Sequence, residues 1–219
     1  MVDASANAYL ELENEKPEIN LFKGSAIRYF RTLGESYQLT TPDGFITYEK
    51  NKCRLFQTCD VAGSTKSNAD YFVLGTFALC PNGELLLLDI LRERLEGPDQ
   101  PMLIKQKFDE YTPAIIGVES ANMGLTMYQQ LRRSGLPVIE LKPDADKYTR
   151  AIPAAMRYEA GMVYHSEEAD WLSDLETELL DFPNGAHDDQ VDVISYAVYM
   201  QSWGYLNVKK RGSRALVLG

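Results

Sequence analysis

The sequence predicts a mixed α/β domain in which three antiparallel strands are followed by alternating helices and strands. Two observations support this prediction. Three β-rich apolar runs, separated by turn residues, lie within residues 54–91. Beyond them, segments with apolar residues at helical spacing alternate with short continuous apolar runs as far as residue 203. These two patterns are typical of helices and buried strands, so we expect a sheet covered by helices.

The bulk composition is that of an ordinary globular domain. The chain has 219 residues, of which 45% are hydrophobic and 25% are charged, which suits one large domain with terminal arms. No apolar run reaches the roughly 20 residues that span a bilayer, and no signal peptide is recognisable. The net charge of −10 argues against constitutive nucleic-acid binding and predicts weak DNA affinity for this chain alone.

The chain divides into four expected segments. They are a flexible arm over residues 1–20, a lead-in segment over 21–52, a folded domain over 53–203 and a basic tail over 204–219. The three cysteines have no C-x-x-C spacing. Cys59 and Cys80 fall in apolar, strand-like runs, so we expect both to be buried thiols in a reducing cytosol.

The elements of the folded domain follow from hydrophobic period and turn residues. The antiparallel strands are predicted at residues 54–62, 71–80 and 84–91, with Pro81, Asn82 and Gly83 as a tight turn between the last two. The later helices are predicted at residues 101–111, 125–133, 146–160, 169–180 and 187–203, and the extended segments between them at 114–119, 138–141 and 162–164.

Two acidic residues lie at the ends of predicted strands. Asp60 follows an apolar run, and Glu119 ends the buried run at residues 114–119. A carboxylate in such a place is costly unless it is paired or holds a cation. Each residue also has a structural explanation, because Asp60 can cap the turn that follows it and Glu119 can cap the next helix or pair with an arginine. Taken singly, neither residue decides between the two readings.

Three further acids open the last predicted helix. Asp188 and Asp192 are four residues apart and share a face, whereas Asp189 points about 100° away. Acids at a helix start can simply complement the helix dipole. Adjacent carboxylates repel each other, however, unless a cation lies between them. Either Asp188 or Asp189 can therefore face one site together with Asp192.

The three acidic positions together predict a metal site. Oxygen ligands of this kind select hard cations, so we expect Mg²⁺ or Mn²⁺. Two such ions about 3.5–4 Å apart would hydrolyse a phosphodiester. The predicted catalytic residues are Asp60, Glu119, Asp188 and Asp189, with Asp192 as a further metal ligand and Asp60 as the bridging acid.

The same residues resemble a known family, the C-terminal nuclease domain of the large terminase subunit of tailed bacteriophages. The resemblance rests on the segments 59–64, 118–120 and 187–193, and it covers roughly residues 21–203. It implies an RNase H-like mixed sheet and a metal-dependent endonuclease that cuts concatemeric viral double-stranded DNA during packaging. The chain lacks the phosphate-binding G-x-x-x-x-G-K-[ST] loop of the terminase ATPase, so we expect an isolated nuclease domain.

Basic residues near these acids are candidates for phosphate contacts. From the resemblance we expect such residues to line the DNA groove; a solvated surface explains them equally well. The candidates are Lys66, Lys142, Lys147, Arg150 and Arg157. His187 either supports a metal-bound water or leaving group, or only caps its helix.

The resemblance also implies partners and a location. We expect double-stranded DNA, the terminase ATPase domain, the small terminase subunit and the portal protein as partners, no membrane contact, a monomeric domain and the host cell cytoplasm. Two alternatives stay open. One is a Holliday-junction resolvase or transposase-type nuclease of the same fold, and the other is a non-catalytic DNA-binding module.

Overall fold

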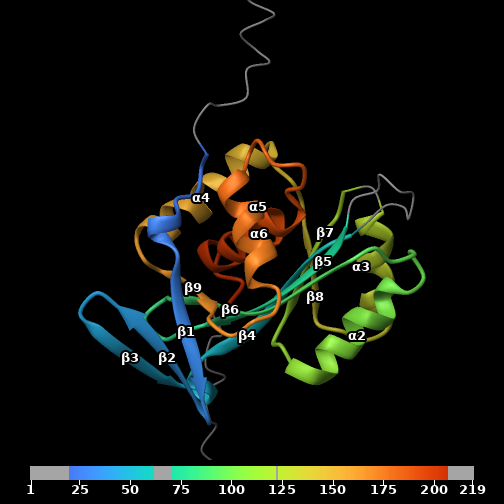
Figure 1. The fold of residues 1–219 in the computed structure, drawn as a ribbon. Helices are drawn as coiled ribbons and strands as arrows, with labels where there is room; N and C mark the ends of the chain where they lie inside the picture. The colour runs from blue at the N-terminus through green and yellow to red at the C-terminus, as the bar shows by residue number, and fades with distance from the viewer. Residues whose placement is uncertain (1–19, 62–70, 122, 207–219) are drawn as a thin grey trace, which may run out of the picture.

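The computed structural model describes residues 20–61, 71–121 and 123–206. They form one nine-stranded sheet with helices on both faces (Figure 1). The strands are β1 Arg28–Leu33, β2 Ser36–Thr41, β3 Gly44–Glu49, β4 Arg54–Asp60, β5 Phe72–Leu79, β6 Leu85–Glu93, β7 Ile116–Glu119, β8 Val138–Leu141 and β9 Val163–Ser166. The α-helices are α2 Gln100–Tyr111, α3 Gly124–Arg133, α4 Lys147–Glu159, α5 Leu172–Asp181 and α6 Asp189–Ser202, and two short 3-10 helices are η1 Gly24–Ala26 and η2 Lys50–Lys52.

The sheet order is β3-β2-β1-β9-β6-β5-β4-β7-β8, and the predicted strands occupy the part from β9 to the β8 edge. Strands β4, β5 and β6 are antiparallel neighbours, while β7 and β8 join β4 in parallel. The turn between β5 and β6 contains Gly83 at a φ of 100°, a conformation that glycine adopts at no steric cost. The predicted mixed α/β fold, with three antiparallel strands before alternating helices and strands, is confirmed.

The lead-in segment contains three strands that the sequence analysis did not predict. Strand β1 pairs in parallel with β9, which pairs in parallel with β6, so β1–β3 extend the same sheet. Phe30 and Leu39 of these strands are buried against Leu86 and Tyr164. Residues 21–52 are thus continuous with the sheet, and the domain boundary at residue 53 stays a prediction.

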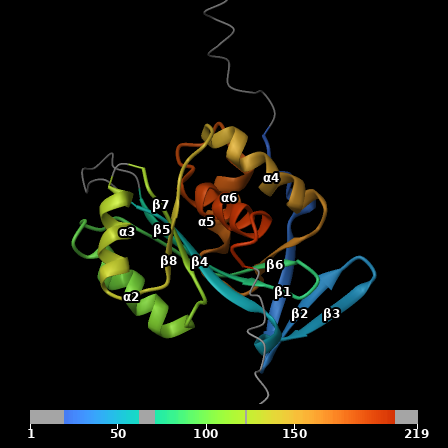
Figure 2. The same ribbon diagram turned by 180° about the vertical axis from the view of Figure 1, so that it is seen from behind.

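The helices cover the two faces of the sheet unequally. Helices α4, α5 and α6 lie on one face and α2 and α3 on the other (Figures 1 and 2). The side chains of strand β4 alternate between the two helix layers. Phe56 packs in the cluster beneath α4–α6, and Cys59 packs in the cluster beneath α2 and α3. Successive residues of a strand therefore face different helix layers.

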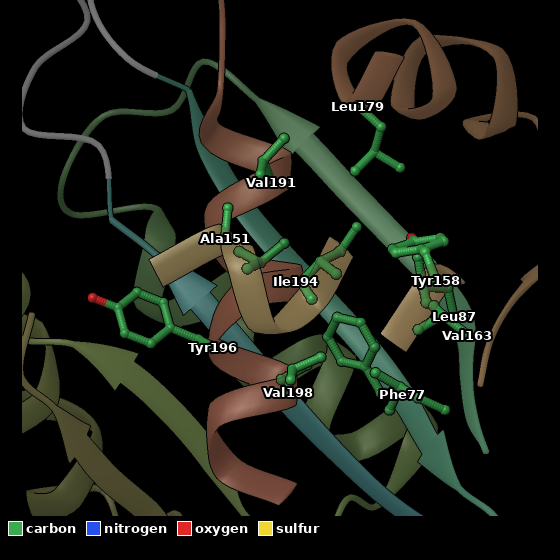
Figure 3. Close-up of a cluster of buried hydrophobic side chains, with 14 of the residues drawn as sticks. Phe77, Leu87, Ala151, Tyr158, Val163, Leu179, Val191, Ile194, Tyr196 and Val198 are labelled. Atoms are coloured by element: carbon green, nitrogen blue, oxygen red, sulfur yellow. The ribbon is translucent and has the colours of Figure 1, made fainter. Parts of the chain in front are cut away.

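Helix α6 is enclosed along most of its length. All of its residues from Asp189 to Val198 are buried, because α4 and α5 cover it on one side and the sheet on the other. Figure 3 shows Val191, Ile194 and Val198 of α6 among side chains of the sheet and of α4 and α5. A helix that is apolar all round is expected in such a position. The acidic residues of its first turn, Asp189 and Asp192, are therefore buried as well.

Two further expectations concern membranes and cysteines. Within the described ranges, no helix combines the length and apolarity needed to cross a membrane. Cys59 and Cys80 are buried free thiols, as predicted. The Sγ atom of Cys80 lies 3.5 Å from that of Cys53.

Candidate metal centre

Asp60 and Glu119 are neighbours at the ends of two parallel strands. The register of β4 and β7 pairs Cys59 with Val118, so the next residue on each strand is one of the two acids. Val118 and Cys59 pack against α2 and α3. Because side chains alternate along a strand, Asp60 and Glu119 both face the opposite layer, where α6 begins.

Asp192 completes a group of three carboxyl groups. It lies in the first turn of α6 and is 2% exposed. One oxygen from each of Asp60, Glu119 and Asp192 lies within 4.8 Å of the other two. The sequence predicts Asp188 and Asp189 as ligands ahead of Asp192, whereas the structure brings Asp192 to the two strand-end acids.

Specific contacts hold the elements that carry these acids. The Thr58 hydroxyl on β4 donates to the carbonyl of Val193 on α6 at 2.7 Å. Buried Glu178 of α5 accepts hydrogen bonds from the backbone and side chain of Gln190 at 2.6 and 2.8 Å. Together these bonds fix the first turn of α6 relative to β4 and to α5.

Glycines allow two close approaches near Glu119. A Cβ atom on Gly124, at the start of α3, would lie 1.8 Å from the carbonyl oxygen of Glu119. A Cβ atom on Gly117 would lie 2.5 Å from Leu141 and 2.6 Å from the sulfur of Met200. Distances this short are closer than packed atoms approach. Position 124 therefore requires glycine, because its neighbour is backbone, whereas a side chain at position 117 would require the Leu141 and Met200 side chains to shift.

The carboxyl groups of Asp60 and Glu119 are harder to ionise than exposed ones. Burial raises the pKa of Asp60 well above its ordinary value, and the neighbouring charges of Glu119, Asp192 and Asp189 add to the effect. Burial and Asp192 also raise the pKa of Glu119, although Arg150 and Tyr196 oppose this. A bound cation would favour the ionised forms of both groups.

Two basic residues of α4 bind the third carboxylate. The Lys147 Nζ atom lies 2.9 Å from Oδ2 of Asp192, and the Arg150 Nη2 atom lies 2.6 Å from Oδ1. Asp146 caps α4 by accepting a hydrogen bond from the Thr149 amide at 2.9 Å, which fixes the turn that carries both cations. Burial alone would lower the pKa values of Lys147 and Arg150, but Asp192 raises both.

The other predicted residues of the α6 start lie in different surroundings. The Asp188 side chain is 38% exposed and accepts a hydrogen bond from Lys147 at 2.6 Å. Asp189 is buried at 3% exposure, lies 4.0 Å from His187 Nδ1, and acts on the pKa of Asp60. Asp189 therefore borders the three-carboxylate group, and Asp188 lies on its solvent side. His187 is 42% exposed and packs edge-on against Tyr71 at 5.1 Å between ring centres.

The remaining predicted DNA contacts are dispersed. Lys142 is 75% exposed and lies 3.7 Å from Glu140. Arg157 donates to the carbonyl of Gly83, at the turn where β5 ends. Since β4 and β5 are antiparallel, this turn lies at the opposite end of β4 from Asp60. Lys66, like the basic tail from residue 207 onward, falls outside the described residues.

Tyr196 also borders the candidate site, although no sequence pattern predicted it. It lies one turn after Asp192 on α6, its ring packs under the Arg150 guanidinium at 5.3 Å, and its hydroxyl lowers the pKa of Glu119. Its spacing of four residues from Asp192 places the two on one helix face. That spacing was the available signal, but the same pattern is found in ordinary core residues.

The donor set of this group fits a hard divalent cation. Asp60, Glu119 and Asp192 offer only carboxylate oxygens, and such ligands suit magnesium, manganese or calcium better than soft metals. Buried acids this close together also repel one another unless cations compensate them. The arrangement is therefore chemically suited to hold divalent cations with open coordination positions for oxygen ligands.

Comparisons with known proteins bear on the fold of this chain. A family model described as the terminase RNaseH-like domain matches residues 57–201. A comparison with curated proteins finds none that matches the chain.

Solved structures share the fold at low sequence identity. The magnesium-bound large terminase nuclease from thermophilic phage G20c is 16% identical, with a TM-score of 0.60 over 84% of this chain and 98% of that chain. The nuclease domain of the Thermus phage P74-26 large terminase is 17% identical, with a TM-score of 0.60 over 83% and 95%. The human cytomegalovirus terminase nuclease domain is 13% identical, with a TM-score of 0.57 over 83% and 95%.

Proposed function

Because the chain belongs to the terminase RNaseH-like domain family, we propose that it is a metal-dependent endonuclease that cleaves double-stranded viral DNA concatemers during genome packaging. The RNase H-like fold that the sequence resemblance implied is confirmed by the family match and by the shared fold of phage large terminase nucleases. The function itself is inferred from that membership together with the acidic site.

The observation that carries the proposal is the meeting of Asp60, Glu119 and Asp192 within 4.8 Å. These three residues, with Asp189 beside them, would hold two Mg²⁺ or Mn²⁺ ions, and Asp60 is the residue that we propose as their shared ligand. Such a pair of ions activates the attacking water and stabilises the leaving oxygen of a phosphodiester. The acids themselves position the ions.

The metals seen in relatives support this cofactor choice. Structures of the G20c nuclease contain magnesium, zinc or cobalt, and the cytomegalovirus nuclease domain was soaked with manganese. The carboxylate-only donor set of this chain favours Mg²⁺ or Mn²⁺ among these ions. Lys147 and Arg150 beside the acids would receive the DNA phosphates, with Lys66, Lys142 and Arg157 as more distant candidates.

The proposed partners follow from the packaging role. The chain also matches a large terminase from another thermophilic bacteriophage, covering 43% of that longer protein with a TM-score of 0.53 at 12% identity. A further structure of that large terminase is a complex with ATP-gamma-S. We propose that this chain works with an ATPase domain, the small terminase subunit and the portal protein, in the host cell cytoplasm.

Cleavage of a supercoiled plasmid tests the proposal. The parent chain should nick or linearise the plasmid with Mg²⁺ or Mn²⁺ and not in the presence of a chelator. Asp60→Asn and Asp192→Asn should lower the rate by roughly 100-fold or more, since loss of even a supporting residue at a metal site costs about 10–100-fold. Asp170→Asn, an exposed acid after β9, serves as the matched control.

Two outcomes would contradict the proposal. Parent-like cleavage by both site variants would exclude the three-carboxylate site as the catalytic centre. Strong preference for a four-way junction over plain duplex would instead favour the resolvase alternative. Circular dichroism of each variant establishes that a lost activity is not a lost fold.

A further inference from the structure

Both oxygens of the Asp192 carboxylate are engaged by cations of the protein itself. Oδ1 binds Arg150 at 2.6 Å and Oδ2 binds Lys147 at 2.9 Å. The Asp192 side chain is 3% exposed, so little water competes for these oxygens. A divalent cation that uses Asp192 as a ligand must therefore share or displace one of these two contacts.

The two cations are not equally free to move. The Arg150 side chain is 11% exposed, stacks on the Tyr196 ring, and donates to the Ala145 carbonyl at 2.9 Å. The Lys147 side chain is 46% exposed and already divides its ammonium group between Asp192 and the outer acid Asp188 at 2.6 Å. Because Lys147 is far more exposed than Arg150 and already has a second acidic partner, it is the cation that can more readily leave Asp192.

The charges explain why these cations lie there. Three carboxylates within 4.8 Å repel one another strongly in a buried site, where charges are poorly screened. Lys147 and Arg150 offset part of this repulsion when no metal is bound. Their positive charge also opposes the arrival of a divalent cation. A phosphate group entering the site offers Lys147 a new anionic partner. The repulsion between Lys147 and the divalent cation is then offset by the phosphate charge.

We propose that Lys147 is a positioning residue that couples cation binding to phosphate binding. Without DNA, it holds Asp192 as an internal counter-ion and weakens the site for divalent cations. When a DNA phosphate arrives, Lys147 transfers to it and Asp192 becomes available to the cation. The inference rests on the proposed function, because it takes the three-carboxylate group as the metal site.

Calcium binding measured by calorimetry, with and without a short DNA duplex, tests the coupling. Calcium suits oxygen ligands, and a gel run after each titration checks that the duplex stays intact. In the parent chain, DNA should tighten Ca²⁺ binding within the usual coupling range of about 5- to 150-fold. Ca²⁺ should tighten DNA binding by the same factor, because such coupling is reciprocal.

Substitutions at Lys147 separate this role from a structural one. Lys147→Met and Lys147→Gln should bind Ca²⁺ alone about 10-fold more tightly than the parent, a change within the usual range of such couplings, and should gain less from DNA. Lys147→Arg should restore parent-like coupling. Lys105→Met is the matched control, since Lys105 is 60% exposed, pairs with Asp109 on α2, and lies on the opposite face of the sheet from α6.

The outcomes distinguish the inference from the function on which it rests. If the parent binds neither Ca²⁺ nor Mn²⁺, the metal site is wrong and the inference fails with it. If the parent binds the metal but Lys147→Met has the same affinity and the same gain from DNA, the inference alone is overturned. Equal effects of Lys105→Met and Lys147→Met would also overturn it, because they would reflect net charge only.

Discussion

At the scale of single residues, burial changes the proton affinity of several groups. Asp60 and Glu119 carry raised pKa values because they are enclosed among other acids. His165 of β9 is fully buried, and burial lowers its pKa although Glu176 opposes the shift. Its ring nitrogens lie 2.7 Å from the Tyr158 hydroxyl and 3.0 Å from Glu176. The neutral imidazole therefore links β9 to α4 and α5.

His165 predicts a loss of stability at acid pH. The unfolded chain takes up a proton near the ordinary histidine pKa of about 6.5, whereas the folded chain resists protonation. The stability that neutral His165 contributes is thus fully present above that pKa and is lost as the pH falls toward the lowered folded value. Urea unfolding of the parent and of His165→Gln between pH 5 and 8 measures this contribution as their difference.

The difference in unfolding free energy between the parent and His165→Gln separates the contribution of His165 from that of the acids. Protonation of Asp60 and Glu119 changes stability in the opposite direction, since raised acid pKa values favour the folded state at low pH. Those contributions are common to parent and variant and cancel in the comparison. A parent-to-variant difference that does not change with pH would contradict the assignment.

At the scale of elements, the start of α3 packs so closely against the end of β7 that no side chain fits between them. The start of α3 passes so close to Glu119 that the Cβ of any other residue at position 124 would overlap the Glu119 carbonyl. The neighbouring atom is backbone, which cannot rotate away as a flexible side chain does. The position of the Glu119 carboxyl group therefore depends on the contact between these two elements.

Gly124→Ala is predicted to disturb the site through this contact. Overpacking of this kind costs about 1–3 kcal/mol of unfolding free energy, and the displaced Glu119 should bind divalent cations more weakly. Urea unfolding and calorimetry with Mn²⁺ measure the two effects. Gly97→Ala is the control, because a Cβ atom on Gly97 meets nothing within 4 Å. Parent-like behaviour of Gly124→Ala would show that the contact does not constrain Glu119.

At the scale of the whole molecule, the sheet is extended by strands from the start of the described chain. Strand β1 pairs with β9, and a separate apolar cluster joins Phe30 and Leu39 to Leu86 and Tyr164. All four side chains are almost fully buried. The nuclease core and the lead-in strands thus share buried surface and one continuous set of backbone hydrogen bonds.

A chain that begins at residue 53 is predicted to be markedly less stable than the parent. Loss of β1 leaves β9 as an edge strand and exposes Leu86 and Tyr164, and each buried large apolar side chain contributes about 1.5–3 kcal/mol. The midpoint of urea unfolding should fall, with some loss of solubility at the new edge. A chain that begins at residue 20 retains every described strand and is the control. Equal midpoints for both truncations would support an independent domain from residue 53.

The sequence by itself determined the order of the central elements and two of the acids that the structure brings together. Period-two and helical patterns, with turn residues between them, predicted β4 to β9 and all five described α-helices within a few residues. It also predicted Asp60 and Glu119 as candidate ligands, because an acid at the end of a buried strand needs a cation or a partner, and the structure brings these two acids together. Secondary structure and the burial of a strand end depend mainly on neighbouring residues, so the local sequence pattern predicts them.

Only the tertiary structure decided which acid of α6 joins Asp60 and Glu119. Spacing along a helix gives the angle between side chains but not the direction in which the helix faces the sheet. That direction is set by contacts distant in sequence, such as Thr58 with Val193 and Glu178 with Gln190. The binding of Lys147 and Arg150 to Asp192 likewise depends on how α4 packs beside α6, and the strands β1–β3 acquire their place only through pairing with β9.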